Sequence, residues 1–159
     1  MATPPGYRMS HSIKDDQPID LMGPVDVLGY VKSGSGVNLT GEVIVREKLE
    51  AYGAIFINGS VSCGGRIKAY GNIIVHGYLS ANEKIKGSGK LKVVGSLDGT
   101  DLEIYGNLSI QGRLTCRRLV VYGSLTLIGS EAESSYYVEE LEQIAGPVIR
   151  REQEADWDW

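Results

Sequence analysis

The chain has few of the residues that build catalytic and metal sites. Its 159 residues include two His, two Cys and one Phe, and no apolar run approaches the ~18 residues of a membrane-spanning helix. A catalytic zinc usually takes three protein ligands, and no Cys, His, Asp and Glu cluster has ligand spacing. No Gly-Lys-Ser/Thr follows the spaced glycines, which argues against a phosphate-binding loop. The composition therefore argues against an enzyme and predicts no cofactor and no metal.

A hydrophobic leader is also missing. The opening MATPPGYRMSHSIKDD lacks the apolar core of a signal peptide, and we expect a cytoplasmic protein. The formal net charge is −4, but the charge is uneven, because residues 131–159 alone carry two basic and nine acidic side chains. The acid is therefore concentrated near the C-terminus.

Helical periodicity is absent between Asp16 and Leu127. Instead, a six-residue unit, x-Gly-x-Φ-x-Φ with Φ aliphatic or small, repeats with little interruption, as in YGAIFI, NGSVSC and GGRIKA. The fourth position is aliphatic in every unit. Alternation places the fourth and sixth positions on one face of a strand, and glycine at the second position suits a corner. Short repeats of this kind are typical of a solenoid, in which each coil needs the next one to cover it.

Three units make one turn. Tyrosine begins a unit at Tyr52, Tyr70, Tyr105 and Tyr122, and the spacings of 18, 35 and 17 residues return the chain to the same corner. The repeat predicts an all-β fold: a triangular, single-stranded, parallel β-helix of about six 17–18-residue coils over residues 16–130. Parallel crossovers are generally right-handed, and we expect that hand here. The stacked tyrosines either stabilise neighbouring coils or bind a ligand.

The three walls of this prism differ at the sixth position. The first wall (for example residues 55–57) has large residues there, whereas the second (61–63) and third (67–69) have smaller ones, which suits close packing across a narrow interior. Cys63 and Cys116 are both inward on the second wall. They are three coils apart, roughly 14 Å at ~4.8 Å per coil, and a disulfide needs Cα atoms within about 7 Å. We expect two buried free thiols.

Both ends depart from the repeat. Residues 1–15 hold two prolines and small polar residues, and we expect a disordered tail. In the acidic tail, 131–159, the segment VEELEQIA predicts a short amphipathic helix over 138–145 that covers the last coil. The final EQEADWDW is either a solvated tail or a peptide that docks on a partner through Trp157 and Trp159.

Outward positions of the third wall form a basic stripe that acidic residues interrupt. The basic stripe comprises Lys48, Arg66, Lys68, Lys84, Lys86 and Arg118. It is either a solvated face or a contact for anionic lipid, nucleic acid or an acidic tail. Because Tyr30 alone among aromatic residues interleaves with these cations, nucleic acid is disfavoured. The chain's own C-terminal tail is the strongest candidate.

Outward apolar residues indicate a lateral contact. Phe56 and Ile74 are neighbours on the first wall, and Ile44 faces outward on the second. A cluster of this kind can mark a site of self-association or partner binding.

The ends of a solenoid leave backbone groups and the apolar interior open, and such edges recruit further strands. With 16–33 and 105–127 as terminal coils, the contacts of a homopolymer would be Val25, Val31, Leu119 and Leu125. A head-to-tail contact need not close, so it builds filaments. If residues 131–159 cap the last coil, the protein instead stays monomeric or forms a closed dimer.

The repeat resembles that of the bactofilins, a family of polymer-forming cytoskeletal proteins. Stretches such as SVSCGGRIKAYGNIIVHGYLSANEKIKG and NLSIQGRLTCRRLVVYGSLTL carry the likeness, which covers residues 16–130. The resemblance implies a right-handed β-helix that polymerises end to end without nucleotide and serves as a scaffold for other proteins or the envelope. Members often have a short membrane-targeting N-terminal segment, whereas the opening residues here contain no apolar stretch.

Two other functions stay open. Left-handed hexapeptide-repeat acyltransferases place an aliphatic residue directly before the small position, whereas here it follows two places later and no catalytic His is well placed. A non-polymerising β-helical binding module would use a flat face, although the regular Thr ladder of an ice-binding face is missing.

Overall fold

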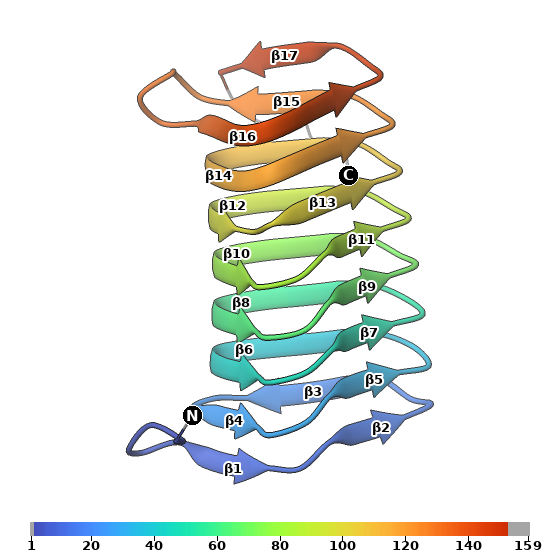
Figure 1. The fold of residues 1–159 in the computed structure, drawn as a ribbon, viewed down its shortest axis with the longest axis vertical. Coiled ribbons are helices and arrows are strands. Elements are labelled where there is room, and N and C mark those ends of the chain that lie inside the picture. Colours follow the sequence, from blue (N-terminus) through green and yellow to red (C-terminus); the bar gives the residue numbers. More distant parts are fainter. Residues whose placement is uncertain (1, 153–159) are drawn as a thin grey trace.

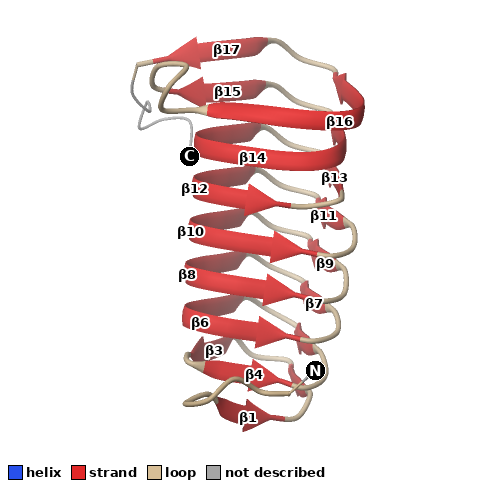
Figure 2. Cartoon of the chain, turned by 60° about the vertical axis from the view of Figure 1, so that its left-hand side comes forward, coloured by secondary structure: helices blue, strands red, loops and turns tan. Residues whose placement is uncertain are grey.

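The predicted β-solenoid is confirmed. The computed structural model describes residues 2–152, in which strands from successive coils stack into a column (Figure 1). Strands on the near side run rightward and distant strands run leftward as the chain rises, so the coil is right-handed (Figure 1). Every regular element in the described part is a strand (Figure 2). No helix that could span a membrane occurs among these residues.

Each wall is a parallel sheet. The first wall stacks β3 (Ile19–Met22), the beginnings of β6 (Val37–Val45), β8 (Ile55–Cys63), β10 (Ile73–Ala81), β12 (Leu91–Asp98) and β14 (Leu108–Val121), then β15 (Leu125–Ile128) and β17 (Val148–Arg151). The second wall stacks β1 (Arg8–Ser10), β4 (Val25–Val27), the later parts of β6, β8, β10, β12 and β14, and the beginning of β16 (Ser135–Ile144). The third wall stacks β2 (Ile13–Asp15), β5 (Val31–Ser33), β7 (Leu49–Ala51), β9 (Ile67–Ala69), β11 (Ile85–Gly87), β13 (Asp101–Ile104) and the ends of β14 and β16.

The strand register carries the apolar interior from coil to coil. On the third wall, Ile67, Ile85 and Leu102 are direct neighbours in the ladder. Each is at most 1% exposed, and together with the equivalent residues of the other walls they form one continuous core. A one-residue slip would turn this aliphatic set outward, so the repeat itself fixes the register.

The corner between the first and second walls requires glycine. Gly59, Gly77, Gly95 and Gly112 pair in successive coils with φ angles between 125° and 147°. A Cβ on Gly95 would lie 2.0 Å from the carbonyl oxygen of Gly77. The corner therefore excludes side chains both by backbone conformation and by the close approach of the next coil.

The N-terminal segment differs from the expected disordered tail over 1–15. β1 and β2 add strands to the second and third walls and pair with β4 and β5. The repeat is hard to recognise here because Arg8 takes the inward position beside Val25, where other coils have an aliphatic residue. Ile13 keeps the pattern, pairs with Val31 and packs against the core.

The helix expected over 138–145 is wrong, because residues 138–144 belong to β16. A helix at this position would leave the edge of β14 unpaired, whereas β16 pairs with that edge. An irregularity in the register opposite Cys116 and Arg118 adds one residue to β16. Val138 and Ile144 pack against the core, whereas Leu141 faces outward, so the spacing of three that resembles a helix does not mark one buried face.

Candidate assembly and binding surfaces

The N-terminal end of the solenoid has an open backbone edge and a polar interior. Within the described residues, β1, β2 and β3 each pair with a strand on one side only. Arg8 and Asp15 stand at inward positions, as their ladder partners Val25 and Ser33 show. The Arg8 guanidinium donates to the Met22 carbonyl at 3.3 Å. This end therefore combines unpaired strand edges with two charged side chains.

The C-terminal end has the same character. β16 pairs with β14, and β17 with β15, each on one side. Glu142 and Arg150 take inward positions above Leu119 and Leu127. The Tyr136 hydroxyl donates to Glu142 at 3.2 Å, and burial together with this carboxylate raises the pKa of Tyr136. Arg150 donates to the carbonyls of residues 129 and 134 at 2.7 and 3.2 Å, which anchors the loop before β16.

The four residues that we expected at a polymer interface lie one coil inside the ends. Each is at most 1% exposed, because β1, β2, β16 or β17 covers it: Val25, Val31, Leu119 and Leu125. They are interior residues of the folded monomer. The end faces are formed instead by the outermost strands, which the repeat does not reveal.

A short strap formed by residues 2–7 crosses the outside of the second wall and buries a carboxylate. Asp26 is at an outward position yet fully buried, since Thr3 donates to it at 2.7 Å and Arg46 donates two hydrogen bonds at 2.9 and 2.7 Å. Arg46 also donates to the Ala2 carbonyl at 3.4 Å. Tyr7 donates to Glu42 at 2.5 Å and ties down the other end of the strap.

The buried carboxylate should make stability depend on pH. Hydrogen bonds from Arg46, with a smaller one from Thr3, hold the pKa of Asp26 below its usual range. The carboxylate therefore stabilises the fold above its ordinary pKa of about 4, and this contribution is lost as pH falls through the lower folded pKa. We expect Asp26→Asn to lower the free energy of unfolding at pH 7, with a difference from the native protein that shrinks towards acid pH. Urea denaturation at several pH values measures this, and exposed Asp16→Asn serves as the control. A difference that stays constant with pH contradicts the assignment.

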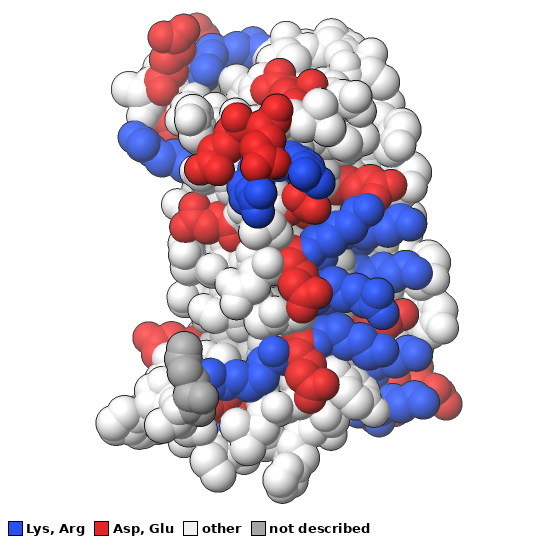
Figure 3. All heavy atoms as spheres, in the orientation of Figure 1, with Lys and Arg blue, Asp and Glu red and all other residues white. Residues whose placement is uncertain are grey.

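The basic stripe is present on the third wall, but carboxylates neutralise part of it. Figure 3 shows its cations gathered on one face with acidic side chains beside them. Lys84 is ion-paired with Glu103, Lys48 lies 3.7 Å from Glu50, and Arg118 lies 3.2 Å from Glu140. The other members of the stripe are Arg66, Lys68 and Lys86. The ion pairs leave the middle of the stripe, around Lys68 and Lys86, as its most cationic part.

Aromatic rings do interleave with this stripe, contrary to our sequence interpretation. The tyrosine column (Tyr52, Tyr70, Tyr105 and Tyr122) lies at the corner between the third and first walls, beside the lysines. The ring centroids of Tyr52 and Tyr70 are 5.2 Å apart, and those of Tyr105 and Tyr122 are 4.7 Å apart, with 5° between the planes of each pair. The ammonium groups of Lys68 and Lys86 lie 4.9 and 5.6 Å from the centroids of Tyr70 and Tyr105. These are cation–π distances.

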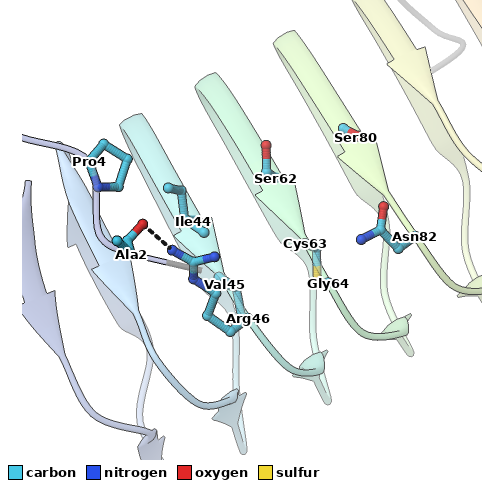
Figure 4. A pocket seen from close by; sticks show the side chains of 10 residues that line it. All are labelled: Ala2, Pro4, Ile44, Val45, Arg46, Ser62, Cys63, Gly64, Ser80 and Asn82. Carbon is cyan, nitrogen blue, oxygen red and sulfur yellow. Dashed lines mark hydrogen bonds between the residues drawn. The ribbon is translucent and has the colours of Figure 1, made fainter.

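The outward apolar residues do not form a single patch. Phe56 is 37% exposed and stacks on His76 with centroids 5.6 Å apart, and Ile74 is its ladder neighbour on the first wall. Ile44 lies on the second wall instead. There it lines an open groove of about 530 Å³ with the strap, Arg46 and the small side chains Ser62 and Ser80 (Figure 4). A lateral contact therefore cannot use all three residues on one flat face.

The two cysteines are buried, and their thiols are not activated. Cys63 and Cys116 are buried and free, as the repeat predicts. Burial raises the pKa of Cys63 to about 11 and that of Cys116 to about 12, so both thiols stay protonated at neutral pH. Across residues 2–152, no group of three or more His, Cys, Asp or Glu side chains is placed to hold a metal ion.

The geometry identifies a parallel β-solenoid with two open end faces, a covered carboxylate and a corner where tyrosines stack beside lysines. Comparisons with models of protein families, with curated proteins and with solved structures find no match to this chain.

Proposed function

We propose that this chain is a bactofilin-like structural protein that stacks end to end into filaments without nucleotide and serves as a scaffold. The support comes from the open edges of β1, β2 and β3 at one end and of β16 and β17 at the other. Each edge offers backbone groups that a further parallel strand would satisfy. The contact is heterologous, so it extends rather than closes.

The observation that carries the proposal is how the two end faces match. A coiled chain ends on one of the three walls. Two copies can stack as one continuous coil only if the first strand of one copy lies on the wall that follows the last strand of the other. Here β1 lies on the second wall and β17 on the first wall. In every coil the chain passes from the first wall to the second. In the stacked arrangement, β1 of a second copy therefore follows β17 along the coil and lies over the beginning of β16 on the second wall. The same placement puts β2 over the end of β16 and β3 over β17, so all three walls continue.

One pair of opposite charges on the two faces comes together in this arrangement. Stacking places Arg8 of one copy over Tyr136 of the other, since both occupy the same inward position of the second wall. Tyr136 itself donates to Glu142, which brings the opposite charge within reach of the guanidinium. This pair favours the head-to-tail arrangement, which brings Arg8 of one copy close to Glu142 of the next.

Charge reversal tests the proposal. We expect the native protein to form filaments visible by negative-stain electron microscopy and to sediment as a polymer. Arg8→Glu and Glu142→Arg should each abolish filaments while thermal melts stay close to native, and the double variant should recover them. Arg66→Glu, an exposed reversal in a middle coil, is the matched control. A native protein that sediments as a monomer at all concentrations rejects the proposal.

One observation favours a second function, a non-polymerising binding module. Inward charges at an open strand edge are also a known protection against edge-to-edge association, and Arg8, Asp15, Glu142 and Arg150 stand at such positions. Under this alternative the native protein is a monomer, and the double reversal behaves like the native chain. The same sedimentation measurement separates the two functions.

A further inference from the structure

The tyrosine column contains a gap of one ring. The backbone N–H groups of Tyr70, Ser88 and Tyr105 each donate to a carbonyl of the preceding coil. The acceptors are the carbonyls of residues 51, 69 and 87, respectively. They therefore occupy the same corner in three successive coils. Ser88 is exposed and has no ring, so it interrupts the stack between the pairs Tyr52–Tyr70 and Tyr105–Tyr122.

The gap has the size of one planar group. Tyr70 and Tyr105 are two coils apart, which at ~4.8 Å per coil separates their rings by roughly 9.6 Å. A ring inserted over Ser88 would lie ~4.8 Å from each neighbour, within the range of favourable aromatic pairs. The stacked tyrosines on either side already use centroid distances of 5.2 and 4.7 Å. An inserted ring would thus continue the spacing that the column has.

The walls of the gap are cationic as well as aromatic. Lys68 and Lys86 precede Tyr70 and Ser88 by two residues, and their ammonium groups lie close to the rings of Tyr70 and Tyr105. Glu103, a carboxylate beside Lys86 in the ladder, already accepts from Lys84 and Tyr105, which hold its pKa below the usual range. The gap therefore suits a planar aromatic group that carries negative charges beside it.

A second hollow in the same column has a different character. Below Tyr52 the column position is Gly34, and a space of about 210 Å³ opens there. Its lining includes Lys14 and Lys32, but also two carboxylates, those of residues 15 and 16, and a ring on one side only. This hollow has one aromatic wall, so it cannot hold a ring between two others. Its carboxylates also offset its lysines, so it favours an anion less than the gap at Ser88 does.

We propose that the Ser88 gap binds the chain's own C-terminal segment, with Trp159 inserted between Tyr70 and Tyr105. The final eight residues, EQEADWDW, hold four carboxylates and the chain's only two tryptophans. Residues 153–159 lie outside the described part, and the proposal rests on their chemistry and on the gap. An indole ring preceded by two nearby aspartates matches an aromatic slot beside two lysines.

The reach of the segment is sufficient. Successive coils place Ser88, Tyr105, Tyr122 and Ala145 at the same corner, so Ala145 lies three coils above Ser88. β17 follows Ala145 along the first wall and ends at Arg151. Three coils and the width of one wall separate the two points by roughly 23 Å. The eight residues that end at Trp159 span up to roughly 27 Å when extended, whereas the six that end at Trp157 span only roughly 20 Å. The segment can therefore dock on its own molecule, independently of the proposed end-to-end stacking.

Tryptophan fluorescence of the full chain tests the docking, because both fluorophores lie in this segment. We expect selective excitation of tryptophan to give emission at shorter wavelength than the free peptide EQEADWDW. A sandwiched ring loses both faces to the protein, so acrylamide quenching should fall by about half or more relative to the peptide. High salt should shift the emission wavelength and the acrylamide quenching towards the values of the free peptide, because it screens the attraction between lysine and aspartate.

Three variants define the site. Ser88→Tyr fills the gap with a residue that four other coils carry at this corner, and should release the segment to the peptide values. Lys86→Gln should release it partially. Ser60→Tyr, the same exchange at an exposed position of the second wall, should leave the native values unchanged. Native fluorescence equal to that of the peptide, or unaltered by Ser88→Tyr, overturns the proposal. Measuring Glu142→Arg as well separates the two proposals, since that variant should lose filaments and keep the docked fluorescence.

Discussion

Alanine at Gly95 is expected to destabilise the solenoid by at least about 3 kcal/mol, because two penalties add at one corner. The φ angle of 125° belongs to a region that side chains rarely adopt, and strain of this kind costs about 1–3 kcal/mol. The new Cβ would also stand 2.0 Å from a backbone oxygen of the neighbouring coil, which cannot turn aside as a flexible side chain can. The coils must separate locally, and the ladder weakens. Urea denaturation followed by circular dichroism measures the loss.

Gly6 provides the matched control for this exchange. Its φ angle is 85°, but a Cβ there meets nothing within 4 Å. Gly6→Ala should therefore cost only about 1 kcal/mol, the conformational part alone. Equal losses at the two glycines would show that close stacking of coils does not constrain the corner.

Aspartate at Leu125 should abolish the native fold. Leu125 is fully buried between its ladder partners Leu108 and Val148. The exchange removes about 2–3 kcal/mol of apolar burial and places a carboxylate in the interior without a partner, at a further cost of several kcal/mol. The sum is comparable with the whole stability of a typical domain, about 5–15 kcal/mol. We expect loss of the β-sheet circular dichroism signal and of cooperative melting.

The control is Leu141→Asp in β16. Leu141 is 41% exposed, so this exchange should change the free energy of unfolding by less than about 1 kcal/mol. A folded Leu125→Asp variant would mean that β17 does not cover the last coil. Because Leu125 belongs to the interior, missing filaments in that variant would report unfolding, and assembly must be tested at the end faces instead.

The repeat predicted the middle of the molecule well because every interior coil meets the same physical demand. A coil covered on both sides must fill its inward positions with aliphatic residues and its tight corner with glycine. An outermost coil is covered on one side only, so Arg8 and Glu142 can stand at inward positions and keep contact with water. The repeat pattern therefore weakens at both ends. The fold continues there, but inward positions no longer require aliphatic residues.

The surfaces were predicted in part. The lysines of the stripe follow from alternation, but their contact with the tyrosine column was missed. A signal existed, since Lys68 and Tyr70 are two residues apart and alternation places such residues on one side of a strand. The burial of Asp26 had no comparable signal, because it depends on Thr3 and Arg46, which lie 23 and 20 residues away.

The identical hydrogen bonding of successive corners also bears on how such a chain can change in length. Ser88 bonds to the carbonyl of Ala69 just as Tyr70 bonds to that of Ala51, so the backbone surroundings of neighbouring coils are interchangeable. Loss or duplication of one whole turn preserves the alignment on all three walls, whereas a change of two or three residues displaces every later aliphatic residue. Divergence in this protein should therefore proceed by whole turns within the column, and smaller insertions should accumulate in places such as the loop before β16.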